Sequence, residues 1–410
     1  MFESSKKYFP IKTETACLKK WTWSSVYLKT GTTNSCHRCN EQLFDVTDFG
    51  SFHNVHKKLD DRKLMLAGRW PVGGCEYCQN IENAGGFSDR MYHLEIPNLT
   101  PPELLVDPTA VTVTPQIVEI YLNNTCNLAC TYCDSAFSSR IQHEIKRFGP
   151  FEFQGIRIVD DHSYVDQELA FKNFCVWLAE NIHNIRRLHF AGGETFFQRE
   201  LDTVLDIIDK HPNKNLELNF ITNLMATKTQ EYVERIKKMI LDKKIGRLDI
   251  TASLDCWGEA AEYIRYGLDL SVWERNFSYI VNQKWIKITV NSVITAMSVK
   301  TTADLIERIN HYRQVRDINH NFLVVGKNPH LHPRIFGGDM WAKDFERMLE
   351  VFPTGYGAHD NERDYLNGIF QYLQTCKTDS IMIERMHVYL DEMDRRRNTN
   401  WKSLFPYLDI

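Results

Sequence analysis

The chain has 410 residues, of which 43% are hydrophobic and 25% are charged, and its formal net charge is −4. These values are ordinary for a globular protein in water, and the near-neutral balance predicts neither a nucleic-acid partner nor an acidic membrane partner. No apolar run reaches the length of a membrane span, and the N-terminal MFESSKKYFPIK lacks the hydrophobic core of a signal peptide. We therefore expect a cytoplasmic protein.

The cysteine count indicates metal binding. Eleven cysteines are many for a cytoplasmic chain, and eight of them gather either in the N-terminal region or in one short loop. In a reducing compartment, metal ligation explains such groups better than disulfides do. Cys175, Cys256 and Cys376 are isolated, and we expect them to pack as small apolar side chains.

Residues 1–105 show little periodicity and carry five of the grouped cysteines, which are Cys17, Cys36, Cys39, Cys75 and Cys78. The pairs SCHRC and GGCEYC each have C-x2-C spacing, which is typical of a four-thiolate zinc site. A Trp-containing strand, KKWTWSSVYL, and a Gly-Thr-Thr-Asn turn are predicted before Cys36.

A proline-rich linker follows, and we place a domain boundary near residue 105. Residues 96–115 contain five prolines that interrupt regular structure, at Pro97, Pro101, Pro102, Pro108 and Pro115.

Strands and helices then alternate up to about residue 335. Period-two apolar patterns predict strands over residues 116–122, 187–190, 216–221, 248–254, 286–294 and 321–325. Amphipathic patterns predict helices over residues 167–185, 201–208, 231–241, 272–281 and 303–309. This alternation predicts an α/β fold with a parallel sheet, and it fits a partial barrel and an open doubly wound sheet equally well.

The last part of the chain is predicted to be helical, over residues 341–351, 363–376 and 380–396. Aromatic residues at helical spacing are expected to pack on the sheet domain; they are Phe345, Tyr365, Phe370, Tyr372, Trp401 and Phe405.

The most specific motif is NNTCNLACTYCDSAFSS, which follows the first predicted strand of the sheet domain. It places Cys126, Cys130 and Cys133 within eight residues of one loop, at C-x3-C-x2-C spacing. Three such thiols can converge on one iron-sulfur cubane and leave its fourth iron without a protein ligand. A zinc loop or three unrelated buried thiols are the alternatives.

This spacing, with Tyr132 just before the last cysteine, resembles the radical S-adenosylmethionine (SAM) enzymes. The resemblance implies a 4Fe-4S cluster on Cys126, Cys130 and Cys133, bound SAM, and cleavage of SAM to a 5'-deoxyadenosyl radical that takes hydrogen from a substrate. It also implies a partial (β/α)6 barrel over residues 106–335 and a helical C-terminal cap over residues 336–410.

The N-terminal region resembles the SPASM and twitch-type auxiliary modules of the same enzymes. The matching run is Gly68, Pro71, Cys75, Cys78, Glu82, Gly85, Ser88 and Arg90. The resemblance implies a second 4Fe-4S cluster on Cys17, Cys36, Cys75 and Cys78. Cys39 is an alternative to Cys17 or Cys36, and zinc is an alternative to iron-sulfur.

Polar groups follow several predicted strands, where ligands of parallel α/β sheets collect. AGGETFF supplies Gly192, Gly193 and Glu194, and it resembles the glycine-rich motif that holds the methionyl amine of SAM. The family usually has proline after the glutamate, where this chain has Thr195. Asn223 ends the third strand, and Leu224 stands where relatives often have glycine.

The fourth strand ends in Ser253, which the resemblance makes a partner for the ribose or carboxylate of SAM. Asp255 is expected to face the substrate, and Cys256 replaces a family glycine. Arg265 is either the partner of the SAM carboxylate or a helix-surface arginine paired with Glu262. In the loop GKNPHLHP, two histidines are expected at the surface without a metal, namely His330 and His332.

The resulting hypothesis is a radical SAM enzyme that acts on a peptide or protein and takes electrons from a donor such as flavodoxin or ferredoxin. A small-molecule substrate, such as a sugar or nucleotide, is the alternative within the enzyme class. A non-catalytic zinc or iron-sulfur scaffold is the alternative outside it.

Overall fold

A computed structural model describes residues 10–86, 88–94, 99–159, 161–352 and 360–410. Pro97 of the predicted linker lies outside these ranges. Within them, no helix combines the length and the apolar character that crossing a membrane would need.

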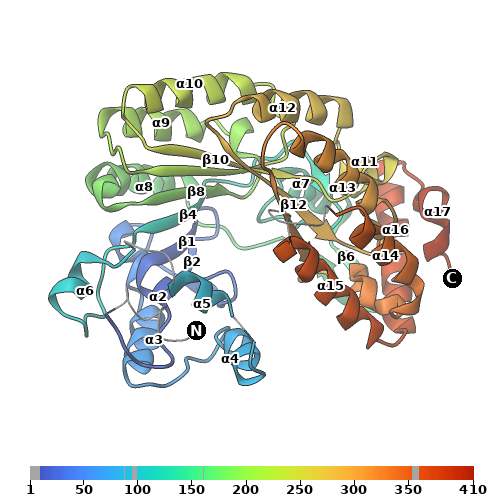
Figure 1. The fold of residues 1–410 in the computed structure, drawn as a ribbon, viewed down its shortest axis with the longest axis horizontal. Helices are drawn as coiled ribbons and strands as arrows, with labels where there is room; N and C mark the ends of the chain where they lie inside the picture. Colours follow the sequence, from blue (N-terminus) through green and yellow to red (C-terminus); the bar gives the residue numbers. More distant parts are fainter. Residues whose placement is uncertain (1–9, 87, 95–98, 160, 353–359) are drawn as a thin grey trace.

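The fold is built on one large, mostly parallel sheet (Figure 1). Within the described residues it has nine strands, in the order β13-β12-β10-β9-β8-β4-β1-β2-β3. Six of them are the predicted strands: β4 (Ile117–Tyr121), β8 (Arg187–Ala191), β9 (Glu217–Thr222), β10 (Arg247–Ser253), β12 (Lys287–Ile294) and β13 (Asn319–Val324). All six run parallel to their neighbours, so the predicted α/β class is confirmed.

Helices connect these strands as predicted. They are α8 (Gln167–Asn181), α9 (Glu200–Lys210), α10 (Thr229–Leu241), α12 (Leu270–Asn282) and α13 (Val299–Arg313). The six strands follow one another in chain order without the reversal that marks a doubly wound sheet. Right-handed crossovers in one direction place the helices on one face, and Figure 1 shows α9, α10 and α12 along the same side.

The two faces of the sheet therefore differ in burial. In β9, Leu218 and Phe220 are fully buried, and the ring of Phe220 stacks on that of Phe190 in β8 with centroids 4.5 Å apart. Asn219, whose side chain points to the opposite face, is only half-buried. The apolar side chains of alternate positions thus form the core under the helices.

The N-terminal part joins this sheet. Its β1 (Trp23–Tyr27) pairs in parallel with β4, and β2 (Thr32–Asn34) and β3 (Gln42–Leu43) continue the sheet antiparallel. The remaining N-terminal helices are α2 (Leu18–Thr22), α3 (His56–Leu66), α4 (Glu76–Asn83), α5 (Asp89–Leu94) and α6 (Pro102–Val106).

The predicted Trp-containing strand is confirmed over Trp23–Tyr27 as β1. The segment KKWTWSSVYL begins as helix α2, however, because Lys20 N and Trp23 N donate to the carbonyls of Cys17 and Lys19. The predicted turn of Gly-Thr-Thr-Asn is strand β2 over its last three residues, because these residues pair with β1.

Segments that the periodicity did not reveal lie between β4 and β8, and after β10. They are α7 (Ser139–Phe148), the hairpin of β6 (Phe151–Phe153) and β7 (Ile156–Val159), and α11 (Glu259–Ile264). Two short strands, β5 (Ala129–Cys130) and β11 (Arg265–Tyr266), pair with each other outside the main sheet.

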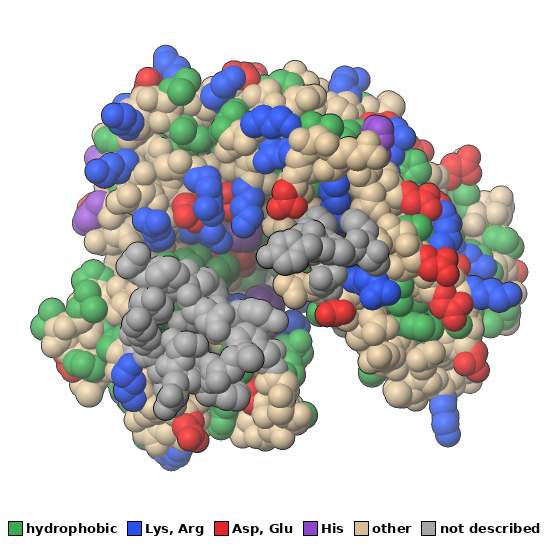
Figure 2. All heavy atoms as spheres, viewed as in Figure 1, with side chains coloured by type: hydrophobic (Ala, Val, Ile, Leu, Met, Phe, Trp, Pro, Cys, Tyr) green, Lys and Arg blue, Asp and Glu red, His purple; other side chains and the backbone are tan. Residues whose placement is uncertain are grey.

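The C-terminal helices are α14 (Ala342–Glu350), α15 (Asp360–Gln374), α16 (Ser380–Arg397) and α17 (Trp401–Leu404). Phe345 stacks on Phe370 with ring centroids 5.3 Å apart, and Trp401 and Phe405 are buried, as predicted. Tyr365 and Tyr372 are about half exposed instead, because they lie on the outer face of α15 while Leu366, Ile369 and Leu373 face the core. Figure 2 shows a hollow between the N-terminal part and these helices.

The shared sheet leads to a prediction about residues 1–105. Removing them would turn β4 into an edge strand and take away the fully buried Val26 of β1. We expect a chain of residues 106–410 to lose stability and self-associate, because an uncovered strand edge templates pairing. Size-exclusion chromatography with light scattering and thermal unfolding would measure both effects against the full chain. A monomer that unfolds at the temperature of the full chain would instead show two independent domains.

Candidate functional site

The cysteine triplet lies in the loop that follows β4. Cys126, Cys130 and Cys133 are half-buried free thiols at this end of the sheet. Burial raises the pKa of all three, that of Cys126 to about 12. Grouped thiols of this kind need a positive charge to become thiolates, and a metal supplies such a charge.

Side chains within the motif fix the loop. Ser138 begins α7 by accepting a hydrogen bond from Ile141 N, and its hydroxyl donates to Leu128 O at 2.8 Å. The amide of Asn124 donates to Ser135 O at 2.7 Å. Ser138 and Asn124 thus act as the capping and turn residues that fix the backbone of the cysteine loop.

The glycine pair after β8 packs directly on this loop. Gly193 has φ +58° and donates to Phe137 O at 3.1 Å, while Glu194 N donates to Thr125 O at 2.9 Å. A Cβ atom on Gly193 would lie 2.5 Å from Thr125 O and would also collide with the amide of Gln198. The absence of a side chain therefore permits the close approach of the two backbones.

Glu194 and Asn223 extend the same contact to β9. The buried carboxylate of Glu194 accepts hydrogen bonds from Thr222 Oγ1 at 2.8 Å and from Asn223 N at 2.6 Å. Asn223 Nδ2 in turn donates to Asn127 Oδ1 in the cysteine loop at 2.8 Å. Burial raises the pKa of Glu194 to about 7, although these hydrogen bonds favour the carboxylate. Leu224 follows with φ +57°, the left-handed conformation that suits the glycine of relatives.

A buried ion pair stands on the other side of the triplet. β11 aligns Arg265 with Cys130 of β5, and the guanidinium makes two 2.9 Å hydrogen bonds to Asp255. Tyr132 Oη donates to Asp255 Oδ2 at 2.8 Å, and Val293 N donates to Asp255 Oδ1 at 2.9 Å. The triplet therefore has a fixed positive charge beside Cys130.

These contacts correct two expectations. Arg265 does not pair with Glu262, which accepts from Leu270 N instead. Asp255 is fully buried in its pair with Arg265 and does not face an open site. Ser253 ends β10 half-buried and lies opposite Asn291 of β12, so these polar groups share the carboxyl edge of the sheet.

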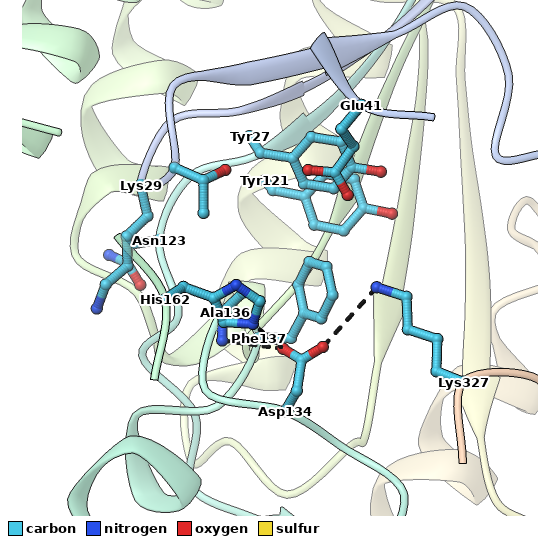
Figure 3. Close-up of a pocket in the computed structure, with 11 residues that line it drawn as sticks. Tyr27, Lys29, Glu41, Tyr121, Asn123, Asp134, Ala136, Phe137, His162 and Lys327 are labelled. Atoms are coloured by element: carbon cyan, nitrogen blue, oxygen red, sulfur yellow. Dashed lines mark hydrogen bonds and ion pairs between the residues drawn. The ribbon is translucent and has the colours of Figure 1, made fainter. Parts of the chain in front are cut away.

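A small pocket of about 40 Å3 adjoins the end of the motif (Figure 3). Segments distant in the chain line it: Tyr27, Lys29, Thr30, Glu41, Tyr121, Asn123, Asp134, Ala136, Phe137, His162 and Lys327. The rings of Tyr27 and Tyr121 stack with centroids 4.2 Å apart and form an aromatic wall. Asp134 lies 3.8 Å from both Lys327 Nζ and His162 Nε2, so charged groups of both signs meet in the pocket.

These pocket residues were not predicted from the sequence. Asp134 directly follows Cys133, and Lys327 stands three residues beyond β13, so the strand-end rule had indicated both regions. The sequence carries no signal for Tyr27 and Lys29 as pocket residues, because their position depends on the pairing of β1 with β4. His330, expected at the surface, is fully buried with its ring 4.6 Å from that of Tyr389, because α16 covers its loop. His332 is half-buried.

The five N-terminal thiols meet in one region. Cys39 lies within hydrogen-bonding reach of Cys36 and Cys75, and its sulfur accepts from Lys20 Nζ at 3.3 Å. The thiol contacts and the ammonium lower the pKa of Cys39, whereas burial raises that of Cys17. No three His, Cys, Asp or Glu side chains in the described ranges are grouped as the ligands of a single metal ion.

No family model matches the chain, and no curated protein matches it.

The tight backbone contact at Gly193 predicts a large effect of a single methyl group. We expect Gly193→Ala to lower the free energy of unfolding by about 2 kcal/mol or more, because the methyl group meets backbone that cannot yield. Gly155→Ala is the matched control, with φ +78° and nothing within 4 Å of the added Cβ, and should cost about 1 kcal/mol. Urea unfolding of the three proteins measures the difference. Equal losses in the two variants would show that the contact carries no strain.

The pKa of Glu194 predicts a pH dependence of stability. Its folded value of about 7 lies above the unfolded value of about 4.3, so the folded state binds more protons between these values. Stability from this group is therefore lost as the pH rises, by about 2 kcal/mol between pH 5 and pH 8. Glu194→Gln should remove this dependence, and the exposed Glu231→Gln should retain it. Urea unfolding of the three proteins at both pH values is the measurement, and parallel losses in all of them would contradict the assignment.

Proposed function

We propose that the chain is a radical SAM enzyme whose 4Fe-4S cluster would be held by Cys126, Cys130 and Cys133. The observation that carries the proposal is the cysteine loop itself, at the carboxyl end of β4 and hydrogen-bonded to the ends of β8 and β9. No comparison with a known protein supports or opposes it.

The residues present match such a cluster in donor type and in spacing along the chain, although no three side chains of the described residues are grouped as the ligands of one metal. Three thiols stand on one loop, and they are close enough for each to affect the ionisation of another. Burial keeps them protonated until a metal arrives, and Arg265 adds a fixed positive charge that favours thiolate at Cys130. The three-cysteine set would leave one iron open to another ligand.

When bound, the cluster and SAM supply the 5'-deoxyadenosyl radical that takes hydrogen from a substrate. The chain's own groups position and enclose these molecules. Gly192 and Gly193 let the end of β8 pack against the cysteine loop, Asn223 joins the end of β9 to the same loop, and Ser253 lies half-buried at the end of β10. Tyr132 is fixed by Asp255 and supplies an aromatic ring next to Cys133.

Arg265 takes a different role from the expected one. Its Nε and Nη2 are both engaged by Asp255, so we do not assign it to the SAM carboxylate. It orients Tyr132 through the shared carboxylate of Asp255 and places charge behind Cys130.

We further propose that the six parallel strands form a partial barrel. Their order without reversal, and the half-buried polar residues on the face opposite the helices, support a concave inner surface. The pocket beside Asp134 would open at its mouth and hold part of the substrate. We keep a peptide or protein as the first substrate class, with a small molecule as the alternative.

The proposal is tested by anaerobic reconstitution. Iron, sulfide and 5'-deoxyadenosine formed under dithionite would be measured for the wild type and for the triple variant Cys126→Ala, Cys130→Ala, Cys133→Ala. We expect about eight irons per chain in the wild type and about four in the triple variant, which should form no deoxyadenosine. Cys256→Ala removes an isolated buried thiol and should behave as the wild type.

Two results would change the conclusion. About four irons with zinc in the wild type would keep the enzyme and replace the second cluster by a structural metal. A wild-type protein that holds no iron and forms no deoxyadenosine would refute the enzyme and leave a metal-free or zinc scaffold.

A further inference from the structure

A row of polar side chains crosses the main sheet on the face opposite the helices. The strand register places one member on each of β1, β4, β8, β9 and β10, and we call these residues the inner row: Ser25, Glu119, His189, Asn219 and Asp249. Their neighbours along the strands, such as Leu188 and Leu218, are fully buried on the helix side. The inner row therefore faces the hollow of Figure 2, and the side chain of His189 is 17% exposed there.

Glu119 lies at the centre of the contacts within this row. Its Oε1 accepts hydrogen bonds from Ser25 Oγ at 2.8 Å and from Tyr121 Oη at 3.1 Å, and its Oε2 lies 3.5 Å from His189 Nδ1. The side chain is buried, yet no lysine or arginine of the described residues forms an ion pair with it. Burial of a carboxylate is costly unless a positive charge lies close to it.

The charged groups next to Glu119 on this face already balance one another. Arg187 Nη2 lies 2.7 Å from Glu217 Oε2, and Arg247 Nε lies 2.8 Å from Asp249 Oδ1, so two basic and two acidic groups are paired. A lysine on β12 stands opposite the aspartate in the register, but it is exposed and four strands away from β4. The carboxylate on β4 is therefore left without a compensating charge.

His189 and Asn219 each present an acceptor beside this carboxylate. Because His189 Nδ1 faces a carboxylate, it carries the proton of the neutral ring, which leaves Nε2 as an acceptor. Burial and Arg187 lower the pKa of His189, against the effects of Glu119 and Asp249, so the ring is neutral at neutral pH. His189 Nε2 and Asn219 Oδ1 are both shielded from solvent, and neither has a hydrogen-bond partner among the described residues. Since buried polar groups are nearly always paired in proteins, these two acceptors indicate a ligand with N–H or O–H donors.

The pocket beside Asp134 adjoins the row. Tyr27 and Tyr121 come two residues after Ser25 and Glu119, so their side chains point to the same face of the sheet. Their stacked rings form one wall of the pocket (Figure 3). The faces of aromatic rings attract cations, so this wall suits a positively charged ligand more than a negatively charged one.

We propose that the inner row binds an aliphatic ammonium group, which donates to His189 Nε2 and Asn219 Oδ1 and compensates the charge of Glu119. An ammonium group has three N–H donors and one positive charge, so it meets both requirements of the row. The inference rests on the proposed function for the place of the substrate, on the inner face of the sheet, and it narrows the substrate to one that carries an amine. In a peptide or protein substrate, this amine is a lysine side chain.

The test uses n-butylammonium as the probe, with n-butanol and butyrate as its uncharged and anionic analogues. The full chain, with isotope-labelled histidine, is titrated with each compound, and NMR follows the ring nitrogens of His189 after assignment with His189→Gln. We expect a neutral ring with the proton on Nδ1 before addition, and saturable shifts with n-butylammonium alone. A ring that is already an imidazolium at neutral pH would itself compensate Glu119 and would overturn the inference.

Variants of the row locate the bound amine. Glu119→Gln keeps the shape of the side chain and removes its charge, so it should weaken n-butylammonium binding about 10-fold or more, and Asn219→Leu should weaken it by a similar factor through the lost acceptor. Glu231→Gln is the matched control, because Glu231 is exposed on α10, and it should bind the probe like the wild type. Urea unfolding confirms that each variant is folded.

The outcomes separate this inference from the proposed function. Equal shifts with n-butanol or butyrate would overturn the choice of a cation, and unchanged binding in both Glu119→Gln and Asn219→Leu would overturn the site. Nα-acetyl-lysine N-methylamide should bind more tightly than n-butylammonium if the amine belongs to a peptide, and equal binding would overturn that source in favour of a small amine. None of these results depends on iron or on deoxyadenosine formation, which test the Cys126 loop.

Discussion

The other groups of the candidate site depend on one close backbone contact, between Gly193 and Thr125. Gly193 lets the end of β8 lie against the carbonyl of Thr125, and the hydrogen bonds of Glu194 and Asn223 follow from that approach. The N-terminal thiols use the same device, since Gly74 lies against Cys39. In both places the lack of a side chain on glycine lets two backbone segments touch. The loop that carries the thiols is thereby fixed by a strand or turn from another part of the chain. Loops that carry function commonly need a rigid scaffold of this kind.

Each thiol group also has a buried basic residue that an acid holds in place. Arg265 aligns with Cys130 and is fixed by Asp255, while Lys20 contacts Cys39 and is fixed by Asp61. Buried ion pairs of this type gain little stability over apolar packing, because desolvation offsets most of the attraction. Their position near sulfur places a positive charge beside each thiol group, which apolar side chains in the same core would not do.

The sequence was sufficient for features that depend on local pattern. The six parallel strands and their helices were predicted because each segment shows its apolar pattern in its own residues. The position of β1 in the sheet was not predicted, since its partner β4 lies about ninety residues away in the chain. The residues of β1 alone do not indicate which strand it pairs with. The buried pair of Asp255 and Arg265 was missed for a similar reason. Arg265 follows a short helix, which suggested a neighbour on that helix, whereas its partner comes from the end of β10. Likewise His330 is buried only because α16 covers its loop.

The shared sheet also fixes where the two thiol groups lie relative to each other. Cys17 and Cys75 belong to a small core that includes Ile117, the first residue of β4, whereas the triplet follows the last residue of the same strand. β1 and β4 run in parallel over five residue pairs, which is about 17 Å of strand at about 3.3 Å per residue. Cys17 and Cys75 are therefore separated from the carboxyl edge by the length of β4, whereas Cys39 stands two residues from Glu41, which lines the pocket beside Asp134. The pairing of β1 with β4 and of β2 with β1 thus brings the Cys36–Cys39 turn toward the pocket while it keeps Cys17 and Cys75 at the opposite end of β4.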